Sequence, residues 1–171
     1  LAAADGVELA ATHTYVPEHY AHAFGTHAAV VEVDSGSGEL TFRAYVAVDD
    51  CGVQFEPTLV EGQVHGGVAQ GVGQALYEGA VYDGRGSLLT GSLMDYALPR
   101  AFHVPEMTVD ETVTPSPHTP TGAKGVGEGG AIVAPPAVVN AVVDALAPLG
   151  VEDLAMPVTG ERVWRAIEQA R

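Results

Sequence analysis

The residue best suited to chemistry is Glu128, which stands in a glycine-rich run, Lys124-Gly125-Val126-Gly127-Glu128-Gly129-Gly130. A carboxylate between two glycines has no bulky neighbour in sequence to pack against. A general base needs such a group, projected into a pocket from a backbone that can approach its target closely. A solvated loop glutamate explains the same residues equally well, so the local sequence leaves both interpretations open.

The glycines of this run also match the pattern G-x-G-x-x-G, through Gly125, Gly127 and Gly130. In a dinucleotide-binding fold that pattern follows a strand, and an acidic residue ends a second strand about 20 residues later. Here the irregular stretch 114–122 precedes the loop, and the nearest acid, Asp144, falls in an expected helix. We therefore keep a nucleotide-binding module only as an alternative. Backbone N–H groups in such a loop can still approach a polar or anionic ligand, although a plain tight turn is the simpler interpretation of the loop alone.

A second candidate surface lies on the segment from Pro57 to about Gly79, which we expect to be helical because apolar residues recur at every fourth position from Val60 to Leu76. Opposite this apolar stripe, amides and glycines share one face at spacings of three and four residues: Gln63, Gly67, Gln70, Gly71 and Gln74. Three amides beside bare backbone suit a flat heterocycle with hydrogen-bonding edges. Packing of another helix against the glycines is the alternative, and it leaves the amides unexplained, so we favour a ligand.

The remaining elements follow from local patterns. Residues 28–50 alternate in hydrophobicity around a turn at 35–38, which predicts a β-hairpin. A strand-turn-strand is expected at 81–89 and a further strand at 107–113, whereas the prolines of 114–122 exclude regular structure.

Two more helices complete the expected fold. One begins at Pro135-Pro136 and stops near Pro148, and Thr159 caps a last amphipathic helix. The fold class is thus α+β, with β-hairpins packed against helices in one cofactor-binding subdomain over residues 1–171.

Composition excludes several classes. Seven Lys and Arg against 22 Asp and Glu give a formal net charge of −15, which disfavours nucleic acid and anionic lipid as partners. The single cysteine, Cys51, excludes an internal disulfide and an iron–sulfur cluster held by this chain alone, and it is expected to be a small buried residue. The histidines show no metal-ligand spacing. No apolar run looks long enough to span a bilayer, and we expect a cytoplasmic protein.

Four segments together resemble one family, in the family's own order: VDDCG at 48–52, VEGQVHGGVAQGVG at 60–73, MDYALP at 94–99 and KGVGEGG at 124–130. The chain resembles, over essentially its whole length, the C-terminal part of the molybdopterin-binding large subunit of the xanthine dehydrogenase, aldehyde oxidase and aerobic carbon monoxide dehydrogenase family. Four matching motifs are far more specific than any one of them.

The resemblance implies roles that the residues alone left open. Glu128 matches the family's glutamate beside molybdenum, the base that deprotonates the metal-bound hydroxide, and it is not expected to be a direct metal ligand. Gln63 matches a glutamine that hydrogen-bonds the pterin. The other implied contacts to the cofactor, in its cytosine dinucleotide form, are Gln70, Gly71, Lys124, Gly125, Val126 and Gly127.

The resemblance also implies the wider enzyme. It is a molybdenum-dependent oxidoreductase that oxidises an aldehyde, an N-heterocycle or a CO-like small molecule with oxygen from water. Its partners are an FAD-binding medium subunit, a small subunit with [2Fe-2S] clusters and a second large subunit. A non-catalytic scaffold of the same fold is an alternative, although a scaffold has no need of a carboxylate among glycines.

The sequence departs from the family in three ways. Glu56-Pro57 stands where the family usually has Asn-Pro, which replaces a good helix cap with a poor one. Gly129-Gly130 replaces the Ser-Pro of CO-oxidising members and favours the branch that acts on aldehydes and heterocycles. The chain also lacks the family's earlier loops, so we expect a fragment that does not bind a complete cofactor by itself.

Overall fold

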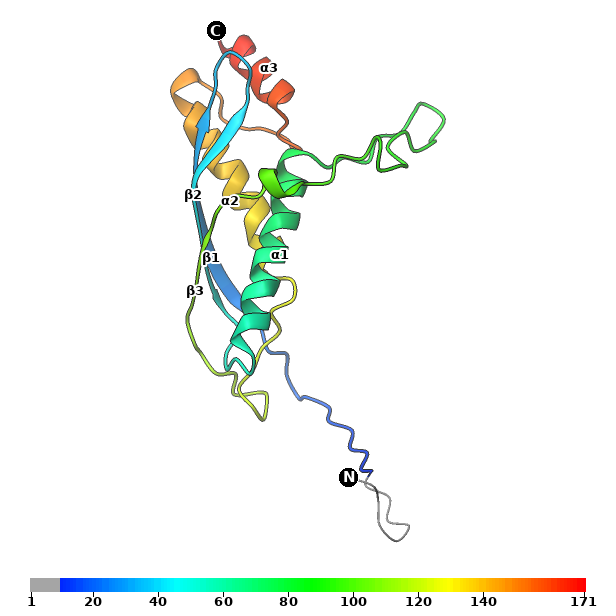
Figure 1. Ribbon diagram of the computed structural model, residues 1–171, viewed down its shortest axis with the longest axis vertical. Helices are drawn as coiled ribbons and strands as arrows, with labels where there is room; N and C mark the ends of the chain where they lie inside the picture. The colour runs from blue at the N-terminus through cyan, green and yellow to red at the C-terminus, as the bar shows by residue number, and fades with distance from the viewer. Residues whose placement is uncertain (1–9) are drawn as a thin grey trace.

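The computed structural model describes residues 10–171, so the first nine residues of the predicted subdomain lie outside the described part. A three-stranded sheet has the order β1 (Phe24–Val33), β2 (Leu40–Asp50) and β3 (Thr108–Glu111). β1 and β2 are antiparallel, whereas β3 runs parallel to β2. Two long helices, α1 (Pro57–Leu76) and α2 (Gly129–Leu146), lie beside each other against this sheet (Figure 1). The predicted α+β class is confirmed.

The β1–β2 hairpin confirms the strongest local prediction, although β1 begins at Phe24 rather than at residue 28. Its turn is closed by Asp34, whose Oδ1 accepts hydrogen bonds from the Gly36 and Ser37 amides at 2.9 and 2.8 Å. Hydrogen bonds from Ser37 and Gly36 lower the pKa of Asp34. Gly38 adopts a φ of 73°, a left-handed conformation that favours glycine.

α1 has the predicted apolar stripe, since Val64, Val68, Val72 and Leu76 are buried. Glu56 makes no side-chain capping bond to this helix within the described residues, as the departure from Asn-Pro predicted. The glycines of α1 have a packing explanation. A Cβ on Gly67 would lie 2.9 Å from the Gly130 Cα, and one on Gly71 would lie 2.5 Å from the Ala134 Cβ. For these two glycines, contact with another helix is therefore sufficient.

α2 corrects a prediction, because it begins at Gly129 and not at Pro135-Pro136. Prolines favour the first turn of a helix, but here both lie inside it, where each removes an N–H from the helical ladder. Close packing overrides that signal: the Gly130 backbone lies against α1, where a Cβ would come within 2.7 Å of the Val64 carbonyl oxygen. The helix consequently starts directly after Glu128.

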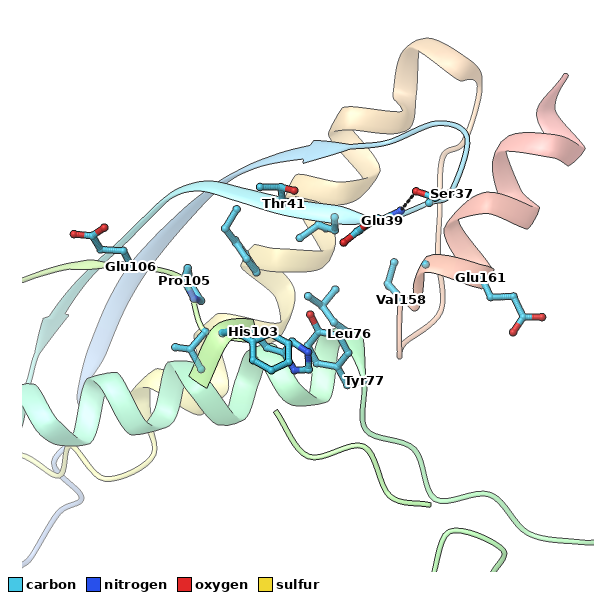
Figure 2. Close-up of a pocket in the computed structure, with 16 residues that line it drawn as sticks. Ser37, Glu39, Thr41, Leu76, Tyr77, His103, Pro105, Glu106, Val158 and Glu161 are labelled. Carbon is cyan, nitrogen blue, oxygen red and sulfur yellow. Dashed lines mark hydrogen bonds between the residues drawn. The ribbon is translucent and has the colours of Figure 1, made fainter. Parts of the chain in front are cut away.

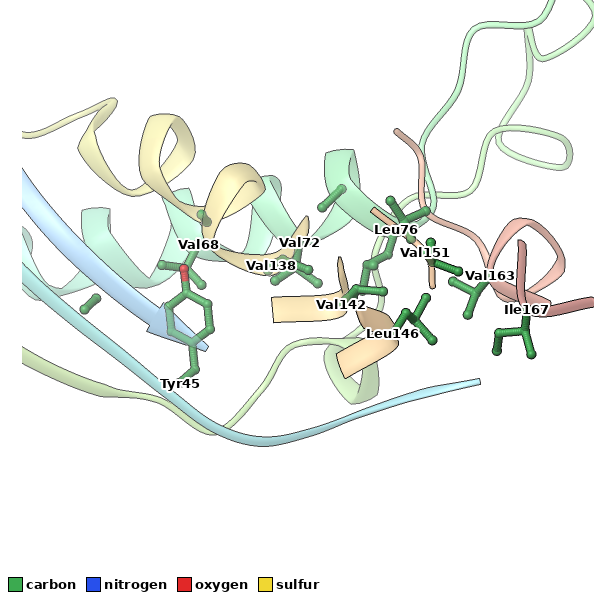
Figure 3. Packing of buried hydrophobic residues seen from close by; sticks show 14 of the residues in the cluster. Tyr45, Val68, Val72, Leu76, Val138, Val142, Leu146, Val151, Val163 and Ile167 are labelled. Carbon is green, nitrogen blue, oxygen red and sulfur yellow. The ribbon is translucent and has the colours of Figure 1, made fainter. Parts of the chain in front are cut away.

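The core lies between the helices and one face of the sheet, as Figure 3 shows. Tyr45 from β2 contributes the largest fully buried side chain, and most of the others are valines. The last helix, α3 (Gly160–Ala170), begins at Thr159, whose hydroxyl accepts a hydrogen bond from the Arg162 amide at 3.3 Å. Val163 and Ile167 anchor this helix in the core, so the predicted cap and stripe are confirmed.

Two short 3-10 helices, η1 (Ala101–His103) and η2 (Ala147–Leu149), complete the elements. The predicted strand-turn-strand at 81–89 is present only in reduced form: a turn with one antiparallel bridge between Tyr82 and Leu88, flanked by the hydrogen bonds Asp83 N–H to Ser87 O and Leu89 N–H to Val81 O. It belongs to an arm that projects from the body of the molecule beyond α1 (Figure 1). Without a neighbouring strand, its alternating residues have no sheet to join. The irregular structure predicted for 114–122 is confirmed.

The expectation that no apolar run could span a bilayer is also corrected. Gly129–Leu149 is long and apolar enough by length and composition alone. The core helix of a soluble protein passes the same test. α2 packs against α1 and β1, and it buries Ala134, Val138, Val142 and Leu146.

Candidate active site

Glu128 occupies the N-cap position of α2, with φ −118° and ψ −13°, and its side chain is exposed. Its carboxylate makes no capping hydrogen bond to the helix among the described residues. N-cap side chains usually accept a hydrogen bond from the first turn, so this carboxylate is not committed to its own helix. It is left available for other contacts.

A hollow of about 690 Å³ opens on one side of Glu128. The start of β1, the end of β2, the glycine loop and the first turns of α2 enclose it. The predicted site residues Gly125, Val126, Gly127 and Glu128 all line this hollow. The structure thus brings most of the loop that was predicted to bind a cofactor to one wall.

A smaller hollow of about 490 Å³ opens on the other side of the same loop. Gln70 and Gln74 from α1 line it together with Glu128 and Pro136. Glu128 thus lines both hollows. Gln70, another predicted cofactor contact, therefore shares a cavity with the predicted base.

Gln63 is exposed and lies beside the loop, since its Nε2 is 3.4 Å from the place that a Cβ on Gly127 would take. The Gln63 amide thus lies beside the loop that carries Glu128, although Gln63 is not among the described residues that line either hollow. Gly71 differs, because Ala134 and Pro135 cover its backbone. A cofactor contact is not needed to explain that glycine.

The start of α2 offers unpaired donors. The first bond in the helix runs from the Ile132 amide to the Glu128 carbonyl at 3.1 Å. The preceding N–H groups, those of Gly129, Gly130 and Ala131, therefore have no acceptor within the helix. The Ala131 nitrogen faces Gly67 of α1 and Gly130 is buried against the same helix, so the Gly129 N–H is the donor of this turn that is suited to a polar or anionic ligand group.

Lys124 does not line either hollow among the residues described. Its ammonium lies 3.0 Å from Asp50 Oδ1, and both side chains are buried, with exposed fractions of 7% and 0%. The contact predicted between Lys124 and a cofactor is still a prediction, but this ammonium already has a partner inside the chain.

Asp50 is the most heavily bonded carboxylate of the site. Burial alone would raise its pKa, but hydrogen bonds to the ionised form outweigh burial and hold that pKa well below its ordinary value. The donors are Thr114, the Gly52 amide, Lys124 and Thr112. Asp50 is therefore ionised, and its hydrogen bonds connect the end of β2 to Thr112 and to Lys124.

Cys51 is buried, and burial raises the pKa of its thiol. The prediction of a small buried residue is confirmed. Among residues 10–171 no group of three His, Cys, Asp or Glu side chains could hold a metal ion.

Sequence reasoning missed three residues near the loop: Asp49, Asp50 and His27. The signals available were the VDDCG segment of the family resemblance, which gave Asp49 and Asp50 no role, and the pair of adjacent acids at the end of an apolar strand, an unfavourable place for charge unless partners are supplied. The partners come from distant positions, and the sequence does not reveal them.

Another hollow, of about 740 Å³, lies near the C-terminal end of α1 (Figure 2). Tyr77 stacks on His103 there, with ring centroids 4.3 Å apart. None of the predicted site residues is among the described residues that line it. We therefore place the candidate active site at Glu128, although this hollow is the larger.

Comparison with known proteins agrees with this geometry. The sequence model of the molybdopterin cofactor-binding domain matches residues 1–105, and the chain belongs to that family. It is 44% identical over 161 residues to the carbon monoxide dehydrogenase large chain of Hydrogenophaga pseudoflava, covering 94% of this chain and 20% of that one. It is 46% identical over 142 residues to the nicotine 6-hydroxylase large subunit of Paenarthrobacter nicotinovorans, covering 83% and 17%.

Solved structures of the same family also resemble the chain. The chain superposes on Cu,Mo-CO dehydrogenase with a TM-score of 0.88 and 40% identity, covering 91% of this chain and 20% of that one. For quinoline 2-oxidoreductase from Pseudomonas putida 86 the TM-score is 0.82 and the identity 46%, covering 85% and 18%. The chain thus spans about a fifth of the length of the relatives it matches.

Proposed function

We propose that this chain supplies the catalytic base and one wall of the cofactor site in the large subunit of a molybdenum hydroxylase. The observation that carries the proposal is the position of Glu128. Its carboxylate caps no helix in the described residues, and the residue lines two hollows and follows a glycine loop beside the Gln63 amide. A free carboxylate at the mouth of a cavity is the geometry a general base needs.

The residues present fit a molybdopterin. Glycines at 125 and 127 leave backbone exposed on the wall of the larger hollow, and the first N–H groups of α2 lack acceptors within the helix. Gly125, Val126 and Gly127 would hold the organic part of the cofactor, with Gln63 and Gln70 offering amides. When bound, the group supplies the two-electron oxidation of the substrate.

The chain's own contribution is proton transfer and orientation. Glu128 accepts a proton at a carboxylate oxygen, and its backbone is fixed by the start of α2. The amides of Gln63 and Gln70 can both donate and accept hydrogen bonds, so they can orient a heterocycle by its edge. The helix contact through Gly67 and Gly71 keeps α1 and its amides at a fixed distance from the loop.

For the substrate we propose an aldehyde, an N-heterocycle or a CO-like small molecule. One relative is named for carbon monoxide and another for nicotine, and their identities to this chain are similar. The pair Gly129-Gly130 after Glu128 supports the aldehyde and heterocycle branch.

We further propose the cytosine dinucleotide form of the cofactor, an FAD-binding medium subunit, a [2Fe-2S] small subunit, a large-subunit homodimer and a cytoplasmic location. The multisubunit character of the relatives supports the partner subunits, since one of them is the gamma subunit of the 6-hydroxypseudooxynicotine dehydrogenase complex.

The test is Glu128→Gln in the complete enzyme, with turnover and molybdenum content measured on the same sample. Loss of a general base lowers the rate by about 10²–10⁴, while KM changes far less. Glu61→Gln is the matched control, because Glu61 is an exposed glutamate on α1. A non-catalytic scaffold predicts that both variants behave like the parent protein.

A further inference from the structure

β2 ends in two adjacent acidic residues that are both buried, Asp49 with 8% and Asp50 with 1% of its surface exposed. Neighbouring side chains on a strand point to opposite faces, so the two carboxylates meet different surroundings. Burying two ionisable groups side by side is costly unless each is paired. Their partners show what the pair does.

Asp50 holds the beginning of the glycine loop. The Lys124 ammonium lies 3.0 Å from its Oδ1 and 4.6 Å from the centre of the Phe24 ring. The Lys124 amide also donates to the Cys51 carbonyl at 2.7 Å. Both the main chain and the side chain of residue 124 are therefore tied to the end of β2, four residues before Glu128.

Asp49 takes part in a buried chain of hydrogen bonds. Its Oδ2 lies 3.2 Å from His27 Nε2, and His27 Nδ1 lies 2.8 Å from the Tyr45 hydroxyl. Burial, together with the charge of Asp49, raises the pKa of Tyr45, so its hydroxyl stays protonated. Tyr45 then donates to Nδ1, and His27 donates its Nε2–H to the carboxylate.

The other oxygen of Asp49 faces the end of the loop. A Cβ on Gly25, which pairs with Asp49 across the hairpin, would lie 2.0 Å from Oδ1. A Cβ on Gly129 would lie 3.7 Å from the same atom. The carboxylate therefore occupies a space between two glycines, at the first residue of α2. An anion at a helix N-terminus is favourable, and Glu128 itself makes no capping bond there among the described residues.

We propose that Asp49 and Asp50 hold the Glu128 loop from its two ends, with Lys124 and His27 as their partners. The four are positioning residues for Glu128. Asp50 fixes the start of the loop through Lys124, and Asp49 fills the space between Gly25 and Gly129 at the start of α2, where Glu128 makes no capping hydrogen bond among the described residues. The carboxylate of Glu128 is thereby left free to face the hollows. This inference rests on the proposed role of Glu128.

The experiment uses the complete enzyme and measures amide hydrogen exchange in the loop before any activity. The variants are Asp49→Asn and the double variant Asp50→Asn with Lys124→Met, which removes both charges and leaves neither one buried alone. Arg43→Gln is the control, because it breaks the exposed Arg43–Glu32 pair of the same hairpin. We expect faster exchange at residues 125–132 in both test variants and no change in the control.

Activity gives a second readout. In Asp49→Asn we expect kcat to fall by about 10–10² fold, as for a small misplacement of a reacting group, while KM and molybdenum content stay within twofold. Unchanged exchange in the loop overturns the proposal. In Asp49→Asn, a loss of kcat that only follows a loss of molybdenum also overturns it, because Asp49 would then support the fold alone.

If Asp49→Asn does not fold, Tyr45→Phe tests the same chain of hydrogen bonds from Tyr45 through His27 to Asp49. It removes only the hydroxyl that donates to His27, and we expect a smaller rise in exchange at residues 129–132. If exchange does not rise in Tyr45→Phe, the proposed positioning role of Asp49 is contradicted. Failure of the proposed function is a separate result: Glu128→Gln would keep full turnover, whereas the exchange measurements do not depend on Glu128 as a base.

Discussion

The two ends of the α1–α2 pair are built differently. At the end near Glu128 the helices approach through Gly67, Gly71 and Gly130, and buried charges lie close by. At the other end Leu76, Val142, Leu146, Val163 and Ile167 form a purely apolar cluster. Of the buried polar residues that the structure describes, Asp49 and Asp50 line the hollow beside Glu128, and His27 bonds Asp49.

The two ends of the α1–α2 pair therefore have different roles. Apolar burial at one end stabilises the helix pair, at about 25 cal/mol per Å² of buried apolar surface. Glycine contacts and buried ion pairs at the other end add less stability, since buried charges must be desolvated. They do fix backbone positions closely, which a catalytic loop requires.

The largest effect is expected from breaking the buried ion pair. Lys124→Met leaves Asp50 charged, buried and without its ammonium partner, which typically costs about 3–5 kcal/mol of unfolding free energy. Urea unfolding at pH 7 measures it. The control is Arg165→Gln, which breaks the exposed Arg165–Glu161 pair and is expected to change stability by less than about 1 kcal/mol. Equal effects in both variants would contradict the importance of burial.

The same pair predicts a pH dependence. The pKa of Asp50 is lowered in the folded protein, so its ionised form stabilises the fold above the ordinary value of 3.8. That stabilisation is lost as the pH falls below 3.8 toward the lower folded value. We therefore expect the acid-induced loss of stability in this range to be smaller in the variant with both Asp50→Asn and Lys124→Met than in the parent chain. If both proteins lose the same amount of stability as the pH falls below 3.8, the attribution of this pH dependence to Asp50 is contradicted.

The apolar end of the helix pair should lose stability when a buried side chain is shortened and a cavity is left. Leu146→Ala removes a side chain that is 1% exposed and should lower the unfolding free energy by about 2–5 kcal/mol. Hydrogen exchange in the Glu128 loop should change little, because the residue lies at the far end of α2. A rise in loop exchange as large as that of Asp49→Asn would show that the two ends are not independent.

A smaller pair of effects tests the glycines of α1. Gly71→Ala would place a Cβ 2.5 Å from the Ala134 Cβ, and overpacking of this kind costs about 1–3 kcal/mol. A Cβ on Gly62 would meet no described atom within 4 Å. Gly62→Ala should therefore stabilise the helix by up to about 1 kcal/mol. Thermal unfolding of both variants checks the opposite signs.

The sequence predicted most local features and few distant ones. The hairpin, α1 and the Thr159 cap depend on periodicity and capping within short segments, and all three were correct. The start of α2 was placed at Pro135, because the glycine contact that moves it to Gly129 joins α2 to another helix.

The site was predictable to a similar extent. Glu128 and the glycine loop form one motif of consecutive residues and Gln63 belongs to another on α1, and the structure places the Gln63 amide beside Gly127. The support beneath the loop was missed, because its contacts join residues that are far apart: His27 and Asp49 are 22 positions apart, and Asp50 and Lys124 are 74 apart. Adjacent acids at a strand end were a signal, but no local pattern named their partners.

The central claim is that Glu128 accepts a proton during substrate oxidation. The most direct test is the rate at which substrate reduces the complete enzyme in a single turnover, without an external electron acceptor, in the parent protein and in Glu128→Gln. Because no external acceptor is present, this rate reports the reduction of the enzyme by its substrate and not the later transfer of electrons to an acceptor. With equal molybdenum content, we predict a decrease of about 10²–10⁴ fold. A variant that is reduced at the parent rate would contradict the claim.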